Sequence, residues 1–261
     1  MNRGNGPMDS ATYPDLAGKI AVVTGGSRGI GAVTARALAR NDVAVAVVAR
    51  DGPALSAVAD GIHQDGGRAL AVAADCTVAP ELARVRDRVH DEFGPVDILV
   101  PFAGGAGMPV PTVQESAEHW RMVVDSELTS AFATISAFLA DMTGGRGGTI
   151  VTMSSAAARQ AAQSSAAYAA AKAGVIALTR HLARELAPDV RVNCVAPAAV
   201  ENDRMRAAMT DEQLGGLGAS FPLGRIGQPA DVAAAVLFLA SQASSWITGA
   251  TLDIAGGKVM V

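Results

Sequence analysis

Three side chains capable of acid/base chemistry lie close together in the sequence. Ser155 offers a hydroxyl, Tyr168 a phenol and Lys172 an amine. Residues four positions apart share one face of a helix, so Tyr168 and Lys172 would stack there. A free phenol titrates at about pH 10, and an adjacent ammonium stabilises its phenolate. The spacing therefore predicts a tyrosine acid/base supported by Lys172, with Ser155 holding a carbonyl or alkoxide oxygen.

A tyrosine one turn from a lysine is also common on the surface of an alanine-rich helix, so the surrounding elements must decide between the two interpretations. Short apolar runs alternate with helical patterns along the chain. We expect strands at residues 20–24, 43–49, 69–73, 96–100, 149–153, 191–195 and 251–254. Besides a helix after the first strand, we expect helices at about 53–65, 79–93, 115–142, 165–187 and 229–240.

This alternation predicts an α/β protein with a single doubly wound parallel β-sheet, or Rossmann fold, and helices on both faces. Ser155 then follows the fifth strand, and Tyr168 lies near the start of the next helix. Such sheets bind ligands at the carboxyl ends of their strands. Because different elements bring Ser155 and Tyr168 to that edge, the pattern favours a reaction site over a surface pair.

A glycine-rich turn, TGGSRGIG at residues 24–31, joins the first strand to the first helix. Glycines there let backbone amides approach a phosphate at the helix N-terminus, and the position of the turn favours a dinucleotide site over a bare turn. Arg50 ends the second strand, and Arg28 lies within the turn. Two cations without an acid at the strand tip favour NADP over NAD, although Asp51 follows directly.

Composition limits the classes of function. The 261 residues are 50% hydrophobic and 18% charged, with a net charge of −4 and two cysteines. We expect one domain at residues 16–261, after a flexible tail at 1–15. Residues 198–222 suit a mobile lid, with an ordinary connector as the alternative. The chain has no basic run suited to nucleic acid and no metal-ligand cluster.

The same composition bears on location. No apolar run approaches the ~20 residues of a membrane span, and residues 1–15 lack the apolar core of a secretory signal. Cys76 and Cys194 lie in apolar segments without metal-ligand spacing. These features predict a cytoplasmic protein with reduced core thiols and no membrane partner.

From Lys19 to Val261 the chain resembles the short-chain dehydrogenase/reductase family, in the branch that contains the 3-oxoacyl-[acyl-carrier-protein] reductases. The residues that carry the resemblance match in order and spacing. They are the glycine turn at 24–31, Asp75, Ser155, YAAAK at 168–172, NCVAP at 193–197 and the C-terminal segment from FPLGRIGQPADV to ITGATLDIAGG.

The resemblance implies an NADP-dependent enzyme that moves a hydride between C4 of the nicotinamide and a carbonyl carbon. It implies that Tyr168 is the general acid/base, that Lys172 supports it and binds the nicotinamide ribose, and that Ser155 holds the substrate oxygen. The cofactor contacts that it implies are Thr24, Gly25, Ser27, Arg28, Gly29, Ile30, Gly31, Arg50, Asp75, Cys76, Ala103, Gly104, Tyr168, Lys172, Val200 and Asn202. Many relatives are tetramers joined through two long helices, so the resemblance implies a homotetramer or homodimer.

The chain departs from the family at three places. Pro101-Phe102 replaces an Asn pair before Ala-Gly, Pro197-Ala198 replaces Pro-Gly, and Glu127 replaces an Asn before Leu. In relatives that last Asn positions a water behind Lys172 in the proton relay. Glu127 therefore joins the candidate catalytic residues with two interpretations. It holds the same water, or it pairs with Lys172 and weakens the field of that ammonium at the phenol.

The expected partner is a small-molecule carbonyl or hydroxy compound. A carrier-protein-bound acyl chain is an alternative, because Arg146 matches one basic position that carrier-using reductases place beside the site, whereas Pro188 replaces another. Two other functions stay open. One is non-redox acid/base chemistry through Tyr168 and Glu127, and the other is a cofactor-binding regulatory protein without turnover. A pure binder does not need the intact set of serine, tyrosine and lysine, which argues against the second.

Overall fold

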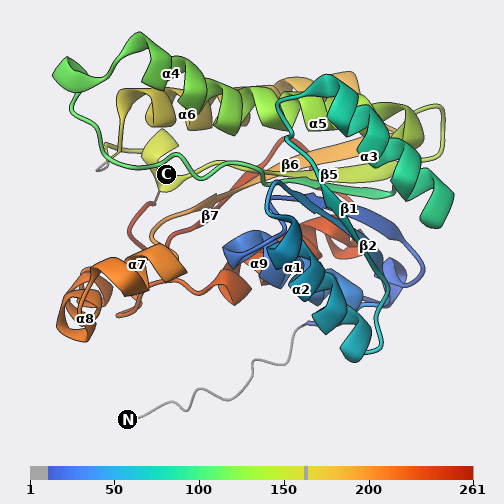
Figure 1. Ribbon diagram of the computed structural model, residues 1–261, viewed down its shortest axis with the longest axis horizontal. Helices are drawn as coiled ribbons and strands as arrows, with labels where there is room; N and C mark the ends of the chain where they lie inside the picture. The colour runs from blue at the N-terminus through green and yellow to red at the C-terminus, as the bar shows by residue number, and fades with distance from the viewer. Residues whose placement is uncertain (1–10, 162–163, 261) are drawn as a thin grey trace.

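Apolar, β-branched runs form seven parallel strands in a computed structural model, which describes residues 11–161 and 164–260 (Figure 1). The strands are β1 (Ile20–Thr24), β2 (Ala44–Ala49), β3 (Ala69–Ala73), β4 (Ile98–Pro101), β5 (Gly148–Met153), β6 (Val190–Pro197) and β7 (Thr251–Ile254). They form one sheet in the order β3-β2-β1-β4-β5-β6-β7. The order reverses between β1 and β4, beside which such sheets bind ligands. The predicted doubly wound parallel sheet is confirmed.

Helices cover both faces of the sheet, as predicted (Figure 1). One face carries α1 (Gly29–Ala39), α2 (Gly52–Gln64) and α9 (Pro229–Ala240), and the other carries α3 (Ala79–Glu92), α4 (Ala117–Val124), α5 (Ser130–Met142) and α6 (Ala166–Glu185). Successive strand residues point to opposite faces. Val47 therefore packs in the core beneath the first group, and Val48 packs in the core beneath the second. Burial on both faces explains the nearly continuous Val and Ala runs of the strands.

The long helix expected at residues 115–142 is interrupted in the structure. It consists of α4, a π-helical turn at Asp125–Thr129, and α5. Such turns occur frequently at functional sites. Glu127, at the centre of the turn, is only 2% exposed. The turn contains no proline or glycine, so the sequence did not reveal the interruption.

One helical stretch requires a correction to the sequence analysis. By length and composition alone, Ala117–Met142 is long and apolar enough to cross a membrane, contrary to the expectation that no run approaches that length. In the fold, however, Val123, Ile135 and Phe138 of this stretch are buried. The stretch therefore forms part of the helical layer on the sheet.

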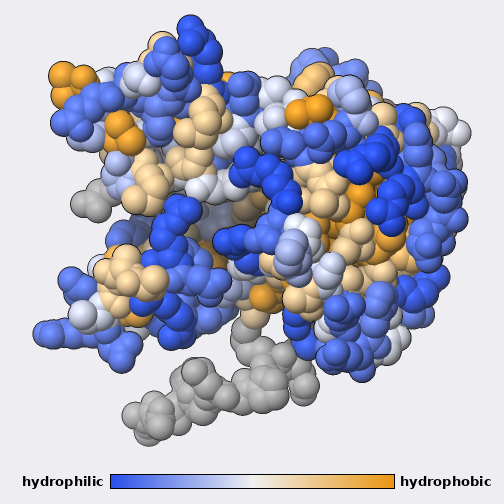
Figure 2. Space-filling view, viewed as in Figure 1, coloured by the Kyte–Doolittle hydropathy of each residue, from blue (hydrophilic) through white to orange (hydrophobic). Residues whose placement is uncertain are grey.

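The segment between β6 and α9 forms two short helices, α7 (Asp203–Ala208) and α8 (Asp211–Ala219). They lie away from the helical layers, beside the carboxyl edge of the sheet (Figure 1). Figure 2 shows a hollow between this segment and the side of the molecule formed by α4 and α6. The expected lid at residues 198–222 corresponds to this segment, and its mobility stays a prediction.

The start of the chain is partly described. Of the flexible tail expected at residues 1–15, residues 1–10 lie outside the described part. In the remainder, the Tyr13 amide donates to Asn41 Oδ1 at 2.7 Å, and the Gln242 amide donates to Asp15 Oδ2 at 2.8 Å. Residues 13–15 are therefore bonded to the folded part of the protein.

Candidate active site

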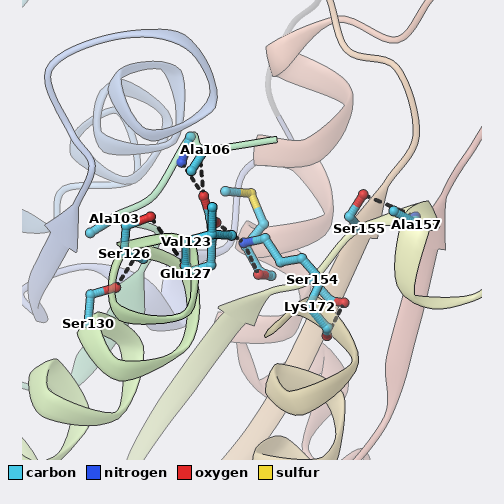
Figure 3. Close-up of polar contacts among 12 residues, drawn as sticks. Ala103, Ala106, Val123, Ser126, Glu127, Ser130, Ser154, Ser155, Ala157 and Lys172 are labelled. Carbon is cyan, nitrogen blue, oxygen red and sulfur yellow. Dashed lines mark hydrogen bonds and ion pairs between the residues drawn. The ribbon is translucent and has the colours of Figure 1, made fainter. Parts of the chain in front are cut away.

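The predicted serine, tyrosine and lysine lie at the carboxyl edge of the sheet. Ser155 follows β5, and its hydroxyl accepts a hydrogen bond from the Ala157 amide at 3.2 Å (Figure 3). Ser165 caps α6 by accepting from the Tyr168 amide at 3.2 Å, which fixes the phenol in the first turns of this helix. Lys172 follows one turn later, with its Nζ 5.7 Å from the centre of the Tyr168 ring. The predicted stacking of the phenol and the ammonium on one helix face is confirmed.

Lys172 is buried, with 3% of the residue exposed. Its Nζ donates to the Met153 carbonyl at 3.0 Å and pairs with Glu127 Oε2 at 2.8 Å. Burial is the largest single effect and lowers the pKa of Lys172, but the charge and hydrogen bond of Glu127, together with the neighbouring Tyr168 and Cys194, raise this pKa overall. Lys172 is therefore held as an ammonium next to the phenol.

Glu127 has a partner at each oxygen (Figure 3). Its Oε1 accepts from the amides of Gly105 and Ala106, both at 2.6 Å, and its Oε2 contacts Lys172. Burial raises the pKa of Glu127, but the charge of Lys172 and these hydrogen bonds lower it overall. Glu127 contacts the Lys172 ammonium directly, as expected from the interpretation in which the two residues form a pair. Its effect on the phenol stays a prediction.

Pro101 and Phe102, which replace the family's Asn pair, both fit into the structure at the end of β4. Pro101 ends β4 and pairs in register with Thr24 of β1. Phe102 is buried in the hydrophobic core. The Thr24 hydroxyl accepts from the Ala103 amide at 3.0 Å and so ties the end of β1 to the segment after β4.

The glycine turn fits an anionic cofactor. Gly25 has φ +66°, and a Cβ there would lie 2.5 Å from the Phe102 carbonyl oxygen, so the turn needs glycine. Within the described residues, Arg28 at the N-cap of α1 makes no side-chain hydrogen bond to the helix. The first amides of α1 are therefore available to a phosphate, which the helix dipole also favours.

The two predicted cations lie beside this turn, and each is paired with an acid. Arg28 Nη2 donates to Asp51 Oδ2 at 2.8 Å, and Arg50 Nη1 lies 3.9 Å from Asp75 Oδ2. The side chains of Arg28 and Arg50 are 68% and 81% exposed. Exposed pairs of this kind are weak, so both guanidinium groups can exchange their partners for an incoming anion.

Asp75 and Cys76 follow β3, as predicted. Hydrogen bonds from the Thr77 hydroxyl and amide hold the pKa of Asp75 below its ordinary value. Burial raises the pKa of the Cys76 thiol to about 11. Asp75 thus presents a carboxylate at the sheet edge, whereas Cys76 stays a neutral thiol.

Val200 and Asn202 lie at the start of the segment between β6 and α9. Val200 is buried and pairs with Gly227 as an isolated bridge. Asn202 caps α7, because its Oδ1 accepts from the Met205 amide at 3.0 Å, and its Nδ2 donates to the Val200 carbonyl at 3.1 Å. The contact expected between Asn202 and a cofactor stays a prediction.

Arg146 lies at the opposite edge of the sheet. It precedes β5, whereas Ser155 follows that strand. Its Nη2 donates to the Pro95 carbonyl at 3.2 Å and lies 3.7 Å from Asp97 Oδ1. Because the two ends of a parallel strand face opposite edges, the expectation that Arg146 stands beside the site of its own chain is wrong.

The contacts that Gly105, Ala106 and Glu115 make at the site were not foreseen from the sequence. The amides of Gly105 and Ala106 are backbone groups, which every residue except proline carries, so no sequence signal marks them. Glu115 accepts from the Ala167 amide of α6 at 3.3 Å and contacts His119 Nδ1 at 3.1 Å. In the sequence, Glu115 looks like an ordinary acid at the start of a helix.

A metal site would need several ligating side chains close together. Across residues 11–161 and 164–260, the structure contains no group of three or more His, Cys, Asp or Glu side chains placed to hold a metal ion.

The chain is similar to a family of known proteins along most of its length. A family model described as Enoyl-(Acyl carrier protein) reductase matches residues 25–258. The 3-oxoacyl-[acyl-carrier-protein] reductase FabG of Vibrio cholerae is 39% identical over 248 residues, which cover 95% of this chain and 100% of the relative. FabG of Escherichia coli is 38% identical and covers 94% of this chain and 98% of its own.

Solved structures agree with these matches. A 3-oxoacyl-[acyl-carrier protein] reductase from Brucella melitensis superposes with a TM-score of 0.88 at 33% identity, covering 95% of this chain and 94% of that chain. Another structure of such a reductase from the same organism, with bound NAD, has a TM-score of 0.85 at 33% identity and the same coverage. These similarities show that the chain belongs to the short-chain dehydrogenase/reductase family of oxidoreductases, in the branch of 3-oxoacyl-[acyl-carrier-protein] reductase-like enzymes.

Proposed function

We propose that the protein is an NADPH-dependent ketoreductase with Tyr168 as its acid/base. It moves a hydride between the nicotinamide and a carbonyl group or secondary alcohol. The observation that carries this proposal is the buried ammonium of Lys172, held one helical turn from Tyr168 at the edge where Ser155 and the glycine turn also lie.

Each side chain has a distinct part in the reaction. NADPH, when bound, supplies the hydride. As the carbonyl carbon is reduced, the Tyr168 hydroxyl gives its proton to the carbonyl oxygen, and the Lys172 ammonium stabilises the phenolate that remains. The Ser155 hydroxyl donates a hydrogen bond to the same oxygen. In the reverse direction, the phenolate takes the proton from the alcohol.

The cofactor site extends from the glycine turn to α6. The amides of the turn and the first turn of α1 bind the pyrophosphate, and Arg28 and Arg50 bind the 2′-phosphate. Lys172 and Tyr168 bind the nicotinamide ribose. The other proposed contacts are Thr24, Gly25, Ser27, Gly29, Ile30, Gly31, Asp75, Cys76, Ala103, Gly104, Val200 and Asn202.

The substrate class follows from the relatives. Their names specify 3-oxoacyl chains on a carrier protein, so we propose a 3-oxoacyl thioester or a related ketone as substrate, covered by the segment 198–222 as a mobile lid. Arg146 faces the other edge of the sheet, so within one chain a carrier protein at the active site is recognised by other residues. Met122 and Phe132 are about half exposed on α4 and α5, which supports the proposed homotetramer or homodimer. We further propose that the protein is cytoplasmic.

The purified protein is expected to oxidise NADPH in the presence of a 3-oxoacyl thioester, because the acid/base set and cofactor turn are both in place. The measurement is the fall in absorbance of the reduced nicotinamide, with 3-oxoacyl chains on a carrier protein, on a small thiol, and with free ketones. The reverse reaction is tested with NADP and hydroxy compounds. Binding of NADPH without turnover on any of them would instead support a regulatory protein.

The Arg50→Ala variant is expected to bind NADPH about tenfold more weakly, since a charge-assisted contact contributes about 1.5 kcal/mol. The dissociation constant for NADH should change less than about twofold, because NADH has no 2′-phosphate. Titration calorimetry measures both constants. Arg40→Ala, at the other end of α1, is the matched control. Equal weakening of both cofactors would contradict the assigned role of Arg50.

A further inference from the structure

We propose that Glu127 is a positioning residue that clasps the segment 104–107 over Tyr168 and holds the Lys172 ammonium in place. The role in catalysis rests on the function proposed above, whereas the clasp itself is a property of the protein alone. Figure 3 shows Glu127 between the segment that contains Ala106 and the side chain of Lys172.

The segment 104–107 is shaped to meet this carboxylate. Gly104 and Gly105 have φ of +152° and +118°, a backbone conformation that other residues rarely adopt. This conformation turns the amides of Gly105 and Ala106 toward the same oxygen, Oε1 of Glu127, at 2.6 Å each. A Cβ at Gly104 would collide with the Glu127 carboxylate. The fit therefore depends on glycine at 104 and on the full length of the glutamate side chain.

The far end of the segment lies against Tyr168. A Cβ at Gly107 would be 3.1 Å from Cζ of the Tyr168 ring, so the backbone at this position is in close contact with the phenol. By binding the amides of Gly105 and Ala106, Glu127 therefore determines how the segment 104–107 packs over the Tyr168 phenol.

The π-helical turn aims Glu127 at these partners. The turn widens the helix at Asp125–Thr129, and two serine hydroxyls bond to backbone carbonyls, one within the turn and one in α4. Ser130 Oγ donates to the Ser126 carbonyl at 2.6 Å, and Ser126 Oγ donates to the Val123 carbonyl at 3.4 Å (Figure 3). A regular helix would displace the side chains that follow by part of a turn relative to the sheet.

The second oxygen of Glu127 maintains the charge of Lys172. The other titratable groups that face this ammonium are Tyr168 on the same helix and Cys194 on β6. Burial raises the pKa of Cys194, which keeps the thiol neutral. Through its charge and its hydrogen bond, Glu127 thus makes the largest contribution against the burial of Lys172.

Two substitutions weaken the clasp in different ways. Glu127→Gln keeps the length of the side chain and one acceptor oxygen but removes the charge that faces Lys172. Gly104→Ala keeps the charge but places a methyl group against the carboxylate. Glu118→Gln makes the same chemical change as the first variant at an exposed position of α4, so it is the matched control.

Amide hydrogen exchange of the protein without cofactor or substrate tests the clasp. In wild type, a peptide covering 104–107 should exchange slowly. In both clasp variants it should exchange at least about tenfold faster, because Gly104→Ala pushes the segment away from the carboxylate and Glu127→Gln replaces two charge-assisted hydrogen bonds by weaker neutral ones. The Glu127→Gln/Gly104→Ala double variant should add little to either single variant, because both break one unit. Glu118→Gln should exchange as wild type does.

The pH profile of kcat/KM tests whether Glu127 keeps Lys172 in its ammonium form. In Glu127→Gln the basic limb should move to lower pH by about one unit, because burial of Lys172 is no longer offset. Unchanged exchange in both clasp variants, additive effects in the double variant, or an unmoved basic limb each overturn the proposal. If Glu127→Gln does not fold, Gly104→Ala carries the exchange test. Since that test needs no turnover, its result is independent of the proposed function.

Discussion

Replacing Tyr168 by phenylalanine is expected to lower kcat/KM for carbonyl reduction by about 10³-fold, the middle of the range for removal of a general acid or base. The substitution deletes the hydroxyl that gives its proton to the carbonyl oxygen and leaves the ring. The Lys172–Glu127 pair does not use the phenol, so the fold and the charge of Lys172 should persist. Initial rates of NADPH oxidation measure the effect.

Two controls isolate this role of the phenol. Tyr13→Phe makes the same chemical change at the other tyrosine of the chain, on the N-terminal segment, and should leave the rate unchanged. The dissociation constant of NADPH, measured separately, should rise by no more than about tenfold in Tyr168→Phe, far less than the loss in kcat/KM, because one hydrogen bond contributes about 0.5 to 1.5 kcal/mol. Turnover that survives in Tyr168→Phe at the wild-type rate would falsify the assignment of the acid/base.

Replacing Lys172 by methionine is expected to lower the free energy of unfolding by about 3 to 5 kcal/mol, because removal of one member of a buried ion pair leaves the other charge unpaired. The charge left behind is Glu127, which is buried and retains only its two amide partners. Chemical denaturation at neutral pH measures the difference. The variant should also lose most of its activity, since nothing then stabilises the Tyr168 phenolate.

The double variant Lys172→Met/Glu127→Gln separates these two losses. It removes both charges, so it should recover a large part of the stability lost in Lys172→Met, and activity should stay low. A double variant less stable than Lys172→Met, or a single variant within about 1 kcal/mol of wild type, contradicts the view of a tightly coupled buried pair.

The pH dependence of stability follows from the same pair. The pKa of Glu127 is lowered in the fold, so its contribution is present above its unfolded value of about 4.3 and is lost as pH falls through the folded value. The pKa of Lys172 is raised, so its contribution is present below about 10.4 and is lost as pH rises through the folded value. The stability difference between wild type and Lys172→Met should therefore be largest between these limits and shrink in acid.

Much of the fold was predictable because the short apolar runs mark the strands and their alternation with helices marks the parallel sheet. The strands expected at residues 20–24, 69–73 and 251–254 have those bounds in the structure. Each is a short apolar run bounded by polar or glycine-rich segments, and the alternation with helices leaves few topologies for a parallel sheet. The interruption of the long helix was not predicted, because the turn at Asp125–Thr129 contains no proline or glycine to mark it and Glu127 within it contacts groups from other segments.

The chemical groups of the site were identifiable from the amino-acid order alone: a serine, a tyrosine and a lysine at spacings that converge on one sheet edge, and a glycine turn before the first helix. These signals are local, since strand ends and helix faces follow from short-range periodicity. The tertiary structure alone decided that Glu127 pairs directly with Lys172, that the amides of Gly105 and Ala106 complete its coordination, and that Arg146 faces the opposite edge. These outcomes depend on groups from separate elements, on backbone amides common to nearly all residues, and on burial, which turns a weak surface attraction into a strong coupling.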